Sequence, residues 1–124
     1  MEKLIYKEET YKIIGICMEV HNILGRGHSE VVYKDALEYE FKMANIACSR
    51  EKQYEIKYKG IILPHHYFAD IIVFDCIILE IKAIECLTDS HIKQLLNYLA
   101  ASKLKLGLLV NFGQDSLEFQ RVVL

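Results

Sequence analysis

YFADIIVFDCIILEIKA, at residues 67–83, sets charged residues into two short apolar runs. The runs IIVF and IIL are rich in β-branched side chains, which is typical of strands that are buried on both faces of a sheet. Asp70, Glu80 and Lys82 stand within or directly beside these runs. A buried charge is costly unless it is paired or bound to a metal, so the three charges together indicate a functional use.

The face on which each charge lies follows from strand geometry. Glu80 and Lys82 point to one face of the sheet and Ile81 to the other, because side chains alternate along a strand. The face of Asp70 depends on the hairpin loop. A two-residue loop places Asp70 opposite Ile81, whereas a three-residue loop or a bulge near Asp70 brings it together with Glu80 and Lys82. Convergence of the three charges therefore predicts an odd loop or a bulge.

If they converge, the charges have the composition of a small metal site. The carboxylates of Asp70 and Glu80 and the backbone carbonyl of Ile81 are hard oxygen ligands that suit Mg²⁺ or Mn²⁺. Lys82 could orient or deprotonate a metal-bound water, or neutralise charge that develops on a phosphate. Two plainer interpretations stay open. Glu80 could pair with Lys82 while Asp70 caps a turn, or the charges could only set the strand register.

Composition indicates an ordinary folded protein. The chain has 124 residues, 52% hydrophobic and 26% charged, which predicts one domain over residues 1–124 rather than a disordered chain. The N-terminus is too charged for a signal peptide, and no apolar run is long enough to span a membrane. The four cysteines are far apart, which predicts small core residues in a reducing cytoplasm rather than disulfides or a zinc site. They are Cys17, Cys48, Cys76 and Cys86.

Net charge gives a mild indication against a dedicated nucleic-acid-binding protein. The formal charge is −2 and the isoelectric point is near 6.2, whereas such domains are usually basic. The basic residues are nevertheless grouped between the first helices and the first strands, where the ordinary interpretation is a solvated edge. They are Arg26, Arg50, Lys52, Lys57 and Lys59.

Periodicity predicts eight elements in the order helix, helix, three strands, helix, two strands. Apolar residues recur at helical spacing in three segments, residues 10–24, 29–44 and 88–102. Five strands are expected, at residues 53–58, 65–74, 77–82, 106–111 and 118–123. A short strand-like stretch, 61–63, precedes the second of them, and Pro64 is predicted to break the chain so that the long second strand starts afresh near His65. A strand meander followed by a helical crossover predicts a mixed sheet flanked by helices, in the α/β to α+β range.

The second predicted helix carries a further acid. Glu30 and Tyr33 are three residues apart and share one helical face. An acid in the first turn complements the helix dipole and needs no other explanation. The functional alternative is a third carboxylate directed at the same site as Asp70 and Glu80.

Several further polar residues allow two interpretations. His91, Gln94 and Tyr98 form a polar stripe on the third helix, which is either solvated surface or the rim of a phosphate-binding cleft. His65 and His66 are adjacent on a strand and point to opposite faces, so they cannot both bind one metal. We interpret these two histidines as structural or surface residues.

The element order and these residues resemble the PD-(D/E)XK nuclease superfamily. Its restriction-endonuclease-like core runs α-β-β-β-α-β, with an Asp on the second core strand and Glu-x-Lys on the third. More closely, the chain resembles the GxxExxY protein family, whose naming motif is present as GHSEVVY at residues 27–33. Other family blocks also stand in order along nearly the whole chain: YKG at 58–60, AD at 69–70, LEIKA at 79–83, HIKQLLNYL at 91–99 and LGLLVNFG at 106–113. Ala69 departs from the superfamily's name, since it replaces the Pro before the Asp.

This resemblance implies a nuclease site, a metal and a substrate. It implies a Mg²⁺- or Mn²⁺-dependent hydrolase of DNA or RNA, or alternatively a non-catalytic nuclease-fold module that binds a protein partner or a nucleic-acid end. In the second case homodimerisation through the last strand or the first helix could supply the missing surface. The implied roles are metal binding for Asp70, Glu80, Glu30 and the Ile81 carbonyl, catalysis for Lys82 with those acids, and substrate contact for Gln94, Tyr98, His91 and Tyr33.

Overall fold

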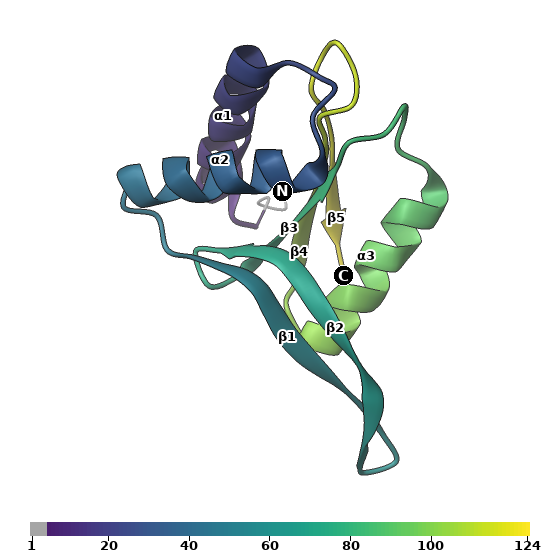
Figure 1. Ribbon diagram of the computed structural model, residues 1–124. Helices are drawn as coiled ribbons and strands as arrows, with labels where there is room; N and C mark the ends of the chain where they lie inside the picture. Colours follow the sequence, from purple (N-terminus) through teal and green to yellow (C-terminus); the bar gives the residue numbers. More distant parts are fainter. Residues whose placement is uncertain (1–4) are drawn as a thin grey trace, which may run out of the picture.

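The computed structural model describes residues 5–124, in which three helices pack on a five-stranded sheet (Figure 1). The order along the chain is α1 (Lys7–Leu24), α2 (Glu30–Met43), β1 (Cys48–Tyr58), β2 (Ile61–Val73), β3 (Ile77–Lys82), α3 (Asp89–Ser102), β4 (Leu106–Asn111) and β5 (Glu118–Val123). This order and the α+β class confirm the prediction from periodicity.

The sheet is mixed. Its strand order is β1-β2-β3-β4-β5, with β3 and β4 parallel and the other neighbours antiparallel. Helix α3 makes the crossover between the two parallel strands, as a parallel pair requires. β3 and β4 are almost wholly buried at the centre of the sheet, so their ends lie in fixed positions.

The two faces of the sheet are covered by different helices (Figure 1). Leu79 and Ile81 belong to the core cluster that includes α1 and α2, whereas Ile78 belongs to the cluster that includes α3. This alternation places Glu80 and Lys82 on the α3 side of β3. Glu80 and Lys82 therefore share one face of the sheet, as predicted.

Strands β1 and β2 form a long hairpin that extends beyond the rest of the sheet (Figure 1). Its tip, Lys59-Gly60, has φ values of 47° and 81°, the left-handed pair that a tight two-residue turn needs. β2 runs through Pro64 without a break, so the predicted interruption is wrong. The register shifts there, because Glu55 pairs with His66 and Lys57 with Ile62, and within this irregularity Pro64 need not donate a hydrogen bond.

The β2–β3 loop has three residues, because Val73 pairs with Ile77. Phe74 and Asp75 take left-handed φ values of 56° and 60° within it. The structure thus selects the loop length that puts Asp70 beside Glu80. The hydrogen-bonded ladder between β2 and β3 ends at the pair Ile71 and Leu79. Beyond this pair β2 stays paired with β1 and diverges from β3, and we call this opening between β2 and β3 the fork.

Two smaller predictions have mixed outcomes. All four cysteines are free, but only Cys17 is buried; Cys86 is exposed because it lies in the loop after β3, so the core prediction fails for it. The first strand begins at Cys48, five residues earlier than predicted, since it pairs with Val73 at the end of β2. In the described part of the chain no helix is both long and apolar enough to cross a membrane.

Candidate functional site

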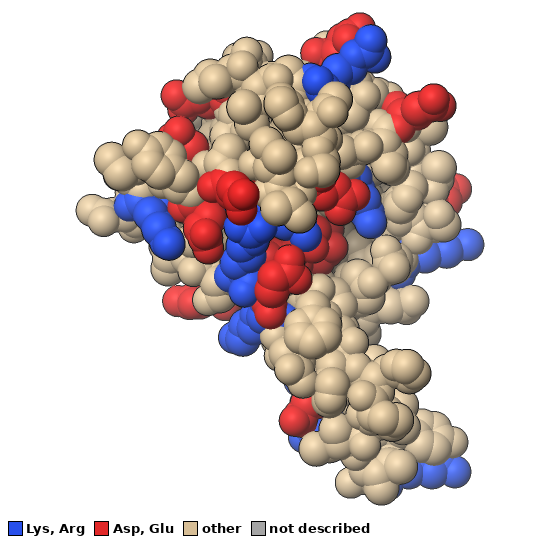
Figure 2. Space-filling view, viewed as in Figure 1, with Lys and Arg blue, Asp and Glu red and all other residues tan. Residues whose placement is uncertain are grey.

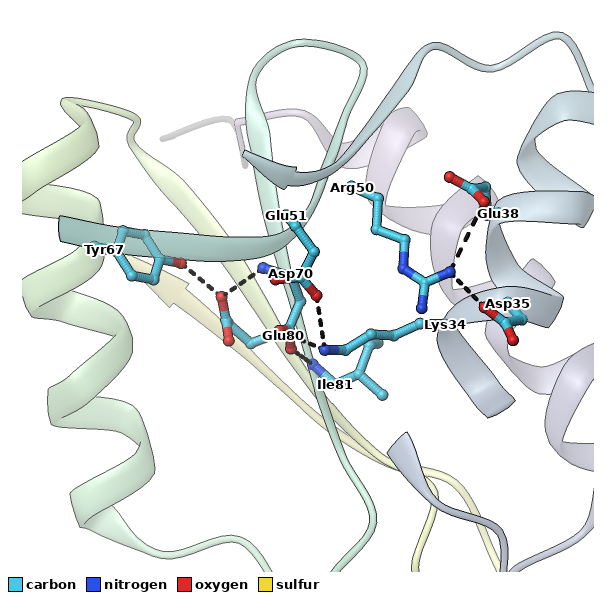
Figure 3. A network of polar contacts seen from close by, with 9 residues as sticks. All are labelled: Lys34, Asp35, Glu38, Arg50, Glu51, Tyr67, Asp70, Glu80 and Ile81. Carbon is cyan, nitrogen blue, oxygen red and sulfur yellow. Dashed lines mark hydrogen bonds and ion pairs between the residues drawn. The ribbon is translucent and has the colours of Figure 1, made fainter. Parts of the chain in front are cut away.

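Asp70 and Glu80 meet at the fork between β2 and β3 (Figure 3). The Asp70 carboxylate oxygen Oδ2 accepts a hydrogen bond of 2.8 Å from the Ile81 backbone N–H. In the other direction, the Asp70 N–H donates to Glu80 Oε1 at 3.3 Å. The two carboxylates therefore replace the ladder hydrogen bonds that the diverging strands no longer make, and they are held against each other by backbone.

An irregularity in β2 lies at Asp70 itself. Tyr67 and Ala69 pack in the cluster with α3, whereas Ile71 packs in the cluster with α1 and α2, so the side-chain alternation changes between them. Opposite on β1, Glu51 has a left-handed φ of 55°. The local distortion leaves the Asp70 carboxylate at the junction between the two helical layers, where groups from both can reach it.

Glu80 is held in a largely dry environment on the α3 side. It is 7% exposed, and its Oε1 accepts a 2.6 Å hydrogen bond from the Tyr67 hydroxyl. The Tyr67 ring in turn stacks on Tyr98 of α3, with the ring centroids 3.6 Å apart. Burial and the neighbouring charge of Asp70 raise the pKa of Glu80 to about 8, although the Tyr67 hydrogen bond opposes the rise.

The raised pKa predicts that the metal-free protein loses stability as pH rises from about 4.5 to about 8. A buried carboxyl with a raised folded-state pKa favours folding while it is protonated, and this contribution is lost as it ionises. The slope from this one group is at most about 1.4 kcal/mol per pH unit within that window. Urea denaturation in EDTA across this range measures it.

Glu80→Gln is the matched variant for this prediction, because the amide keeps an acceptor for the Tyr67 hydroxyl and cannot ionise. Its unfolding free energy should be flatter with pH than that of the wild type. Glu19→Gln, at an exposed position on α1, should leave the wild-type slope unchanged. Equal slopes for Glu80→Gln and wild type would show that Glu80 ionises normally in the folded protein.

Lys34 of α2 approaches Asp70 from the other layer (Figure 3). Its Nζ lies 2.9 Å from Asp70 Oδ1 and 3.2 Å from Glu51 Oε1, and the residue is buried. Burial lowers the pKa of Lys34, but the hydrogen bonds and charges of Asp70 and Glu51 outweigh burial and raise it. Sequence reasoning missed this residue. The sequence did hold a signal for it: Lys34 lies three and seven residues before the apolar Leu37 and Phe41, on the same helical face. A lysine on a buried face needs an acidic partner.

Further charged side chains lie around Lys34 and Asp70. Arg50 Nη1 of β1 lies 2.5 Å from Asp35 Oδ1 and 3.8 Å from Glu38 Oε1, both on α2. Acidic and basic side chains gather at the centre of the view in Figure 2, where the hairpin leaves the body. Carboxylates outnumber cations in the network drawn in Figure 3, so its balance favours an additional cation.

Lys82 ends β3 on the same face as Glu80 and is half-buried. No ion pair of Lys82 occurs within residues 5–124. The chain after it is fastened by Asn111, whose buried side chain accepts from the Ile84 N–H and donates to the Ile84 carbonyl, each at 3.0 Å. Gly113 is required here, since a Cβ would lie 2.1 Å from the Ile84 carbonyl oxygen. These contacts hold the backbone that follows Lys82 in one position.

The two residues predicted from the second helix make no hydrogen bond or ion pair with Asp70 or Glu80 in the described residues. Glu30 is the half-buried first residue of α2, and no group of three His, Cys, Asp or Glu residues placed to hold a metal occurs in residues 5–124. Tyr33 is fully buried, stacks on Phe112 at 4.5 Å and donates a 2.6 Å hydrogen bond to the Gly25 carbonyl. Its hydroxyl therefore fastens the loop between α1 and α2 from inside the core.

The polar stripe of α3 divides into separate parts. Tyr98 joins the site through its stack on Tyr67, and burial together with the charges of Glu80 and Asp70 raises its pKa. Gln94 is exposed, and its hydrogen bond to Tyr98 opposes that rise. His91 serves the helix end, because its Nδ1 accepts a 3.0 Å hydrogen bond from the Thr88 N–H.

The donor set at the fork fits a small divalent cation. Asp70 and Glu80 supply carboxylate oxygens. Asp70 Oδ1 and Oδ2 each make one contact and Glu80 Oε1 accepts two hydrogen bonds, and a carboxylate can accept more contacts than these. The Ile81 carbonyl is a further oxygen donor in the same segment. One or two carboxylates are enough for Mg²⁺, which keeps several waters.

Comparison with known proteins identifies the family of the chain and a similar fold. A family model described as the PD-(D/E)XK nuclease superfamily matches residues 7–122. A solved structure titled "Crystal structure of SSO0001" is similar in fold, with a TM-score of 0.60 and 24% identity over 95% of this chain. The chain spans 59% of that protein's length. A comparison with curated proteins gave no match. Nucleases of the matched superfamily typically use divalent metals, and the chain belongs to the PD-(D/E)XK nuclease superfamily.

Proposed function

We propose that this protein is a Mg²⁺- or Mn²⁺-dependent phosphodiesterase that hydrolyses DNA or RNA, with residues 1–124 acting as one nuclease-like domain. The observation that carries the proposal is the contact between Asp70 and Glu80 at the fork, with Lys82 two residues further along the same face of β3. Membership of a nuclease superfamily supports the reaction class.

Each residue at the fork has a defined task in this proposal. Asp70, Glu80 and the Ile81 carbonyl hold the cation, with Glu30 as the helix-borne acid implied by the motif. A bound divalent cation supplies Lewis acidity toward the phosphate and lowers the pKa of water. Lys82 takes the proton from the attacking water or neutralises the charge that develops on the phosphate. Gln94 and Tyr98 contact the substrate from α3, with His91 as a further predicted contact on the same helix. Tyr33, the fourth predicted contact, is fully buried, so its part is to hold the loop before α2 rather than to touch the substrate.

The direct test is cleavage of labelled single- and double-stranded DNA and RNA by purified protein with Mg²⁺, Mn²⁺ or EDTA. We expect cleavage with either metal and none with EDTA. Protein that binds the metal but leaves every substrate intact would contradict the proposal, and so would equal cleavage in EDTA.

One observation favours a second candidate function, a non-catalytic module that binds a partner protein or a nucleic-acid end. Lys34 already neutralises Asp70 at 2.9 Å, so the fold has a cation at this carboxylate without a metal. Calorimetric titration with Mn²⁺ separates the two candidates. Absence of heat from the wild type, and no change in Asp70→Ala, would favour the module.

Lys34 also gives a prediction on metal rescue. In EDTA, Lys34→Met should lower the unfolding free energy by about 1–3 kcal/mol, because the Asp70 carboxylate loses its partner while the side-chain volume is kept. Added Mn²⁺ should recover more stability in Lys34→Met than in wild type, since the ammonium and the metal compete for one negative charge. Thermal melts with and without Mn²⁺ measure both effects.

Lys12→Met, at an exposed position on α1, is the matched control and should respond to Mn²⁺ as the wild type does. If Mn²⁺ stabilises Lys34→Met no more than it stabilises Lys12→Met, the metal does not sit at Asp70.

A further inference from the structure

A groove of about 890 Å³ runs between the edge strand β1 and the C-terminal end of α3. Lys52, Tyr54 and Lys57 line it from the strand, and Asn97 and Lys103 line it from the helix side. The groove lies outside the carboxylate site, and none of these residues entered the proposed hydrolysis.

The charge of the groove suits an anion. Among residues 5–124, Lys52, Lys57 and Lys103 line it with one carboxylate, that of Glu55, which leaves an excess of positive charge on a chain whose net charge is −2. All three lysines are exposed, so their ammonium groups can reach a ligand. β1 is also an edge strand, and an edge presents backbone N–H groups without partners. Both features favour phosphate groups along an extended chain.

A row of stacked rings links this groove to the carboxylates. Tyr54 stacks on Tyr67 with the centroids 6.0 Å apart, and Tyr67 stacks on Tyr98 and donates to Glu80. Lys52 Nζ lies 5.5 Å from the centre of the Tyr54 ring. A cation beside an aromatic surface is the pairing that holds a phosphate and its base together.

We propose that the β1–α3 groove binds single-stranded nucleic acid and leads it to the fork. This inference rests on the proposed function and adds the strandedness and path of the substrate. Unpaired bases can stack on tyrosine, whereas bases in a duplex are already stacked and paired. A volume of about 890 Å³ lies within the range of small-ligand pockets, about 300–1,000 Å³, which suits a few nucleotides of one strand and not a duplex.

Binding without cleavage is the test. Fluorescence anisotropy in EDTA, with labelled oligothymidylate and oligouridylate about 12 nucleotides long, measures affinity while hydrolysis is off. We expect the wild type to bind at least one single strand, and to bind a duplex of equal length at least about tenfold more weakly. An extended acidic peptide of equal charge is the competitor for the β1 edge.

The groove variant is Lys52→Ala/Lys57→Ala/Lys103→Ala, and the matched control is Lys7→Ala/Lys12→Ala/Lys42→Ala on α1 and α2. The groove variant should bind at least tenfold more weakly, and its plot of log affinity against log salt should be shallower by about 2, since each lost phosphate contact on a single strand removes about 0.7. The control should retain wild-type affinity and salt slope. Tyr54→Leu, checked by thermal melting for a retained fold, should weaken binding with the salt slope unchanged.

The outcomes separate the groove from the proposed hydrolysis. Loss of binding in the groove variant together with no cleavage by the wild type in Mg²⁺ or Mn²⁺ supports the groove and rejects the nuclease. Cleavage by the wild type with equal binding by the groove and control variants keeps the nuclease and overturns the groove. Tighter binding of the peptide or the duplex than of either single strand also overturns it.

Discussion

Lys82→Ala is expected to lower metal-dependent cleavage by about 10²- to 10⁴-fold, the range that one positioned acid–base group contributes. The fold should be retained, because Lys82 is half-buried at the end of β3 and forms no ion pair within residues 5–124. Single-turnover cleavage with saturating Mn²⁺ measures the loss, and far-UV circular dichroism with a thermal melt checks the fold.

Two further variants sharpen this result. Lys82→Arg keeps the positive charge but cannot act as a base, so retained cleavage would assign Lys82 to charge neutralisation and lost cleavage would assign it to proton transfer. Lys93→Ala, at an exposed position on α3, removes an equal charge and should leave cleavage unchanged. A Lys82→Ala protein that cleaves as fast as Lys93→Ala would exclude any catalytic role for Lys82.

The second large effect is expected at Asp70. Asp70→Asn should weaken Mn²⁺ binding by at least about 100-fold, since even residues that only support a metal ligand cost about 10- to 100-fold. The asparagine oxygen can still accept from the Ile81 N–H, but its NH2 group then replaces Oδ1 beside the Lys34 ammonium, so a thermal melt checks that the fold is retained. Isothermal titration with Mn²⁺ measures the loss, and Asp75→Asn in the β2–β3 loop is the matched control.

Asp70→Ala separates the structural task of this side chain from its charge. It leaves the Ile81 N–H without an acceptor and removes one of the two carboxylates on Lys34. We expect a loss of unfolding free energy on the order of 3 kcal/mol, the lower end for breaking a buried pair, because Glu51 still accepts from Lys34. Equal stability of Asp70→Ala and Asp70→Asn in urea would show that the Ile81 hydrogen bond kept by the asparagine does not exceed the cost of its NH2 group beside Lys34.

Local patterns in the chain were sufficient for most of the architecture. Helical spacing and β-branched runs predict the element order, because the faces that must be buried are written into the periodicity of each segment. The shared face of Glu80 and Lys82 also follows from alternation alone, since both lie on one short strand with no irregularity between them. The break expected at Pro64 failed because its pairing partner on β1 is irregular at the same place.

The assembly of the site depends on contacts between segments that are distant in the chain. Whether Asp70 meets Glu80 turns on a single residue of loop length and on a distortion opposite Glu51, and a strand pattern records neither. Lys34 reaches Asp70 because α2 packs across the fork, whereas Tyr33, its neighbour, points into the core. Periodicity specifies which side of an element is buried. Which charges then meet is set by the packing of one layer on another, because that contact is made between residues far apart in sequence.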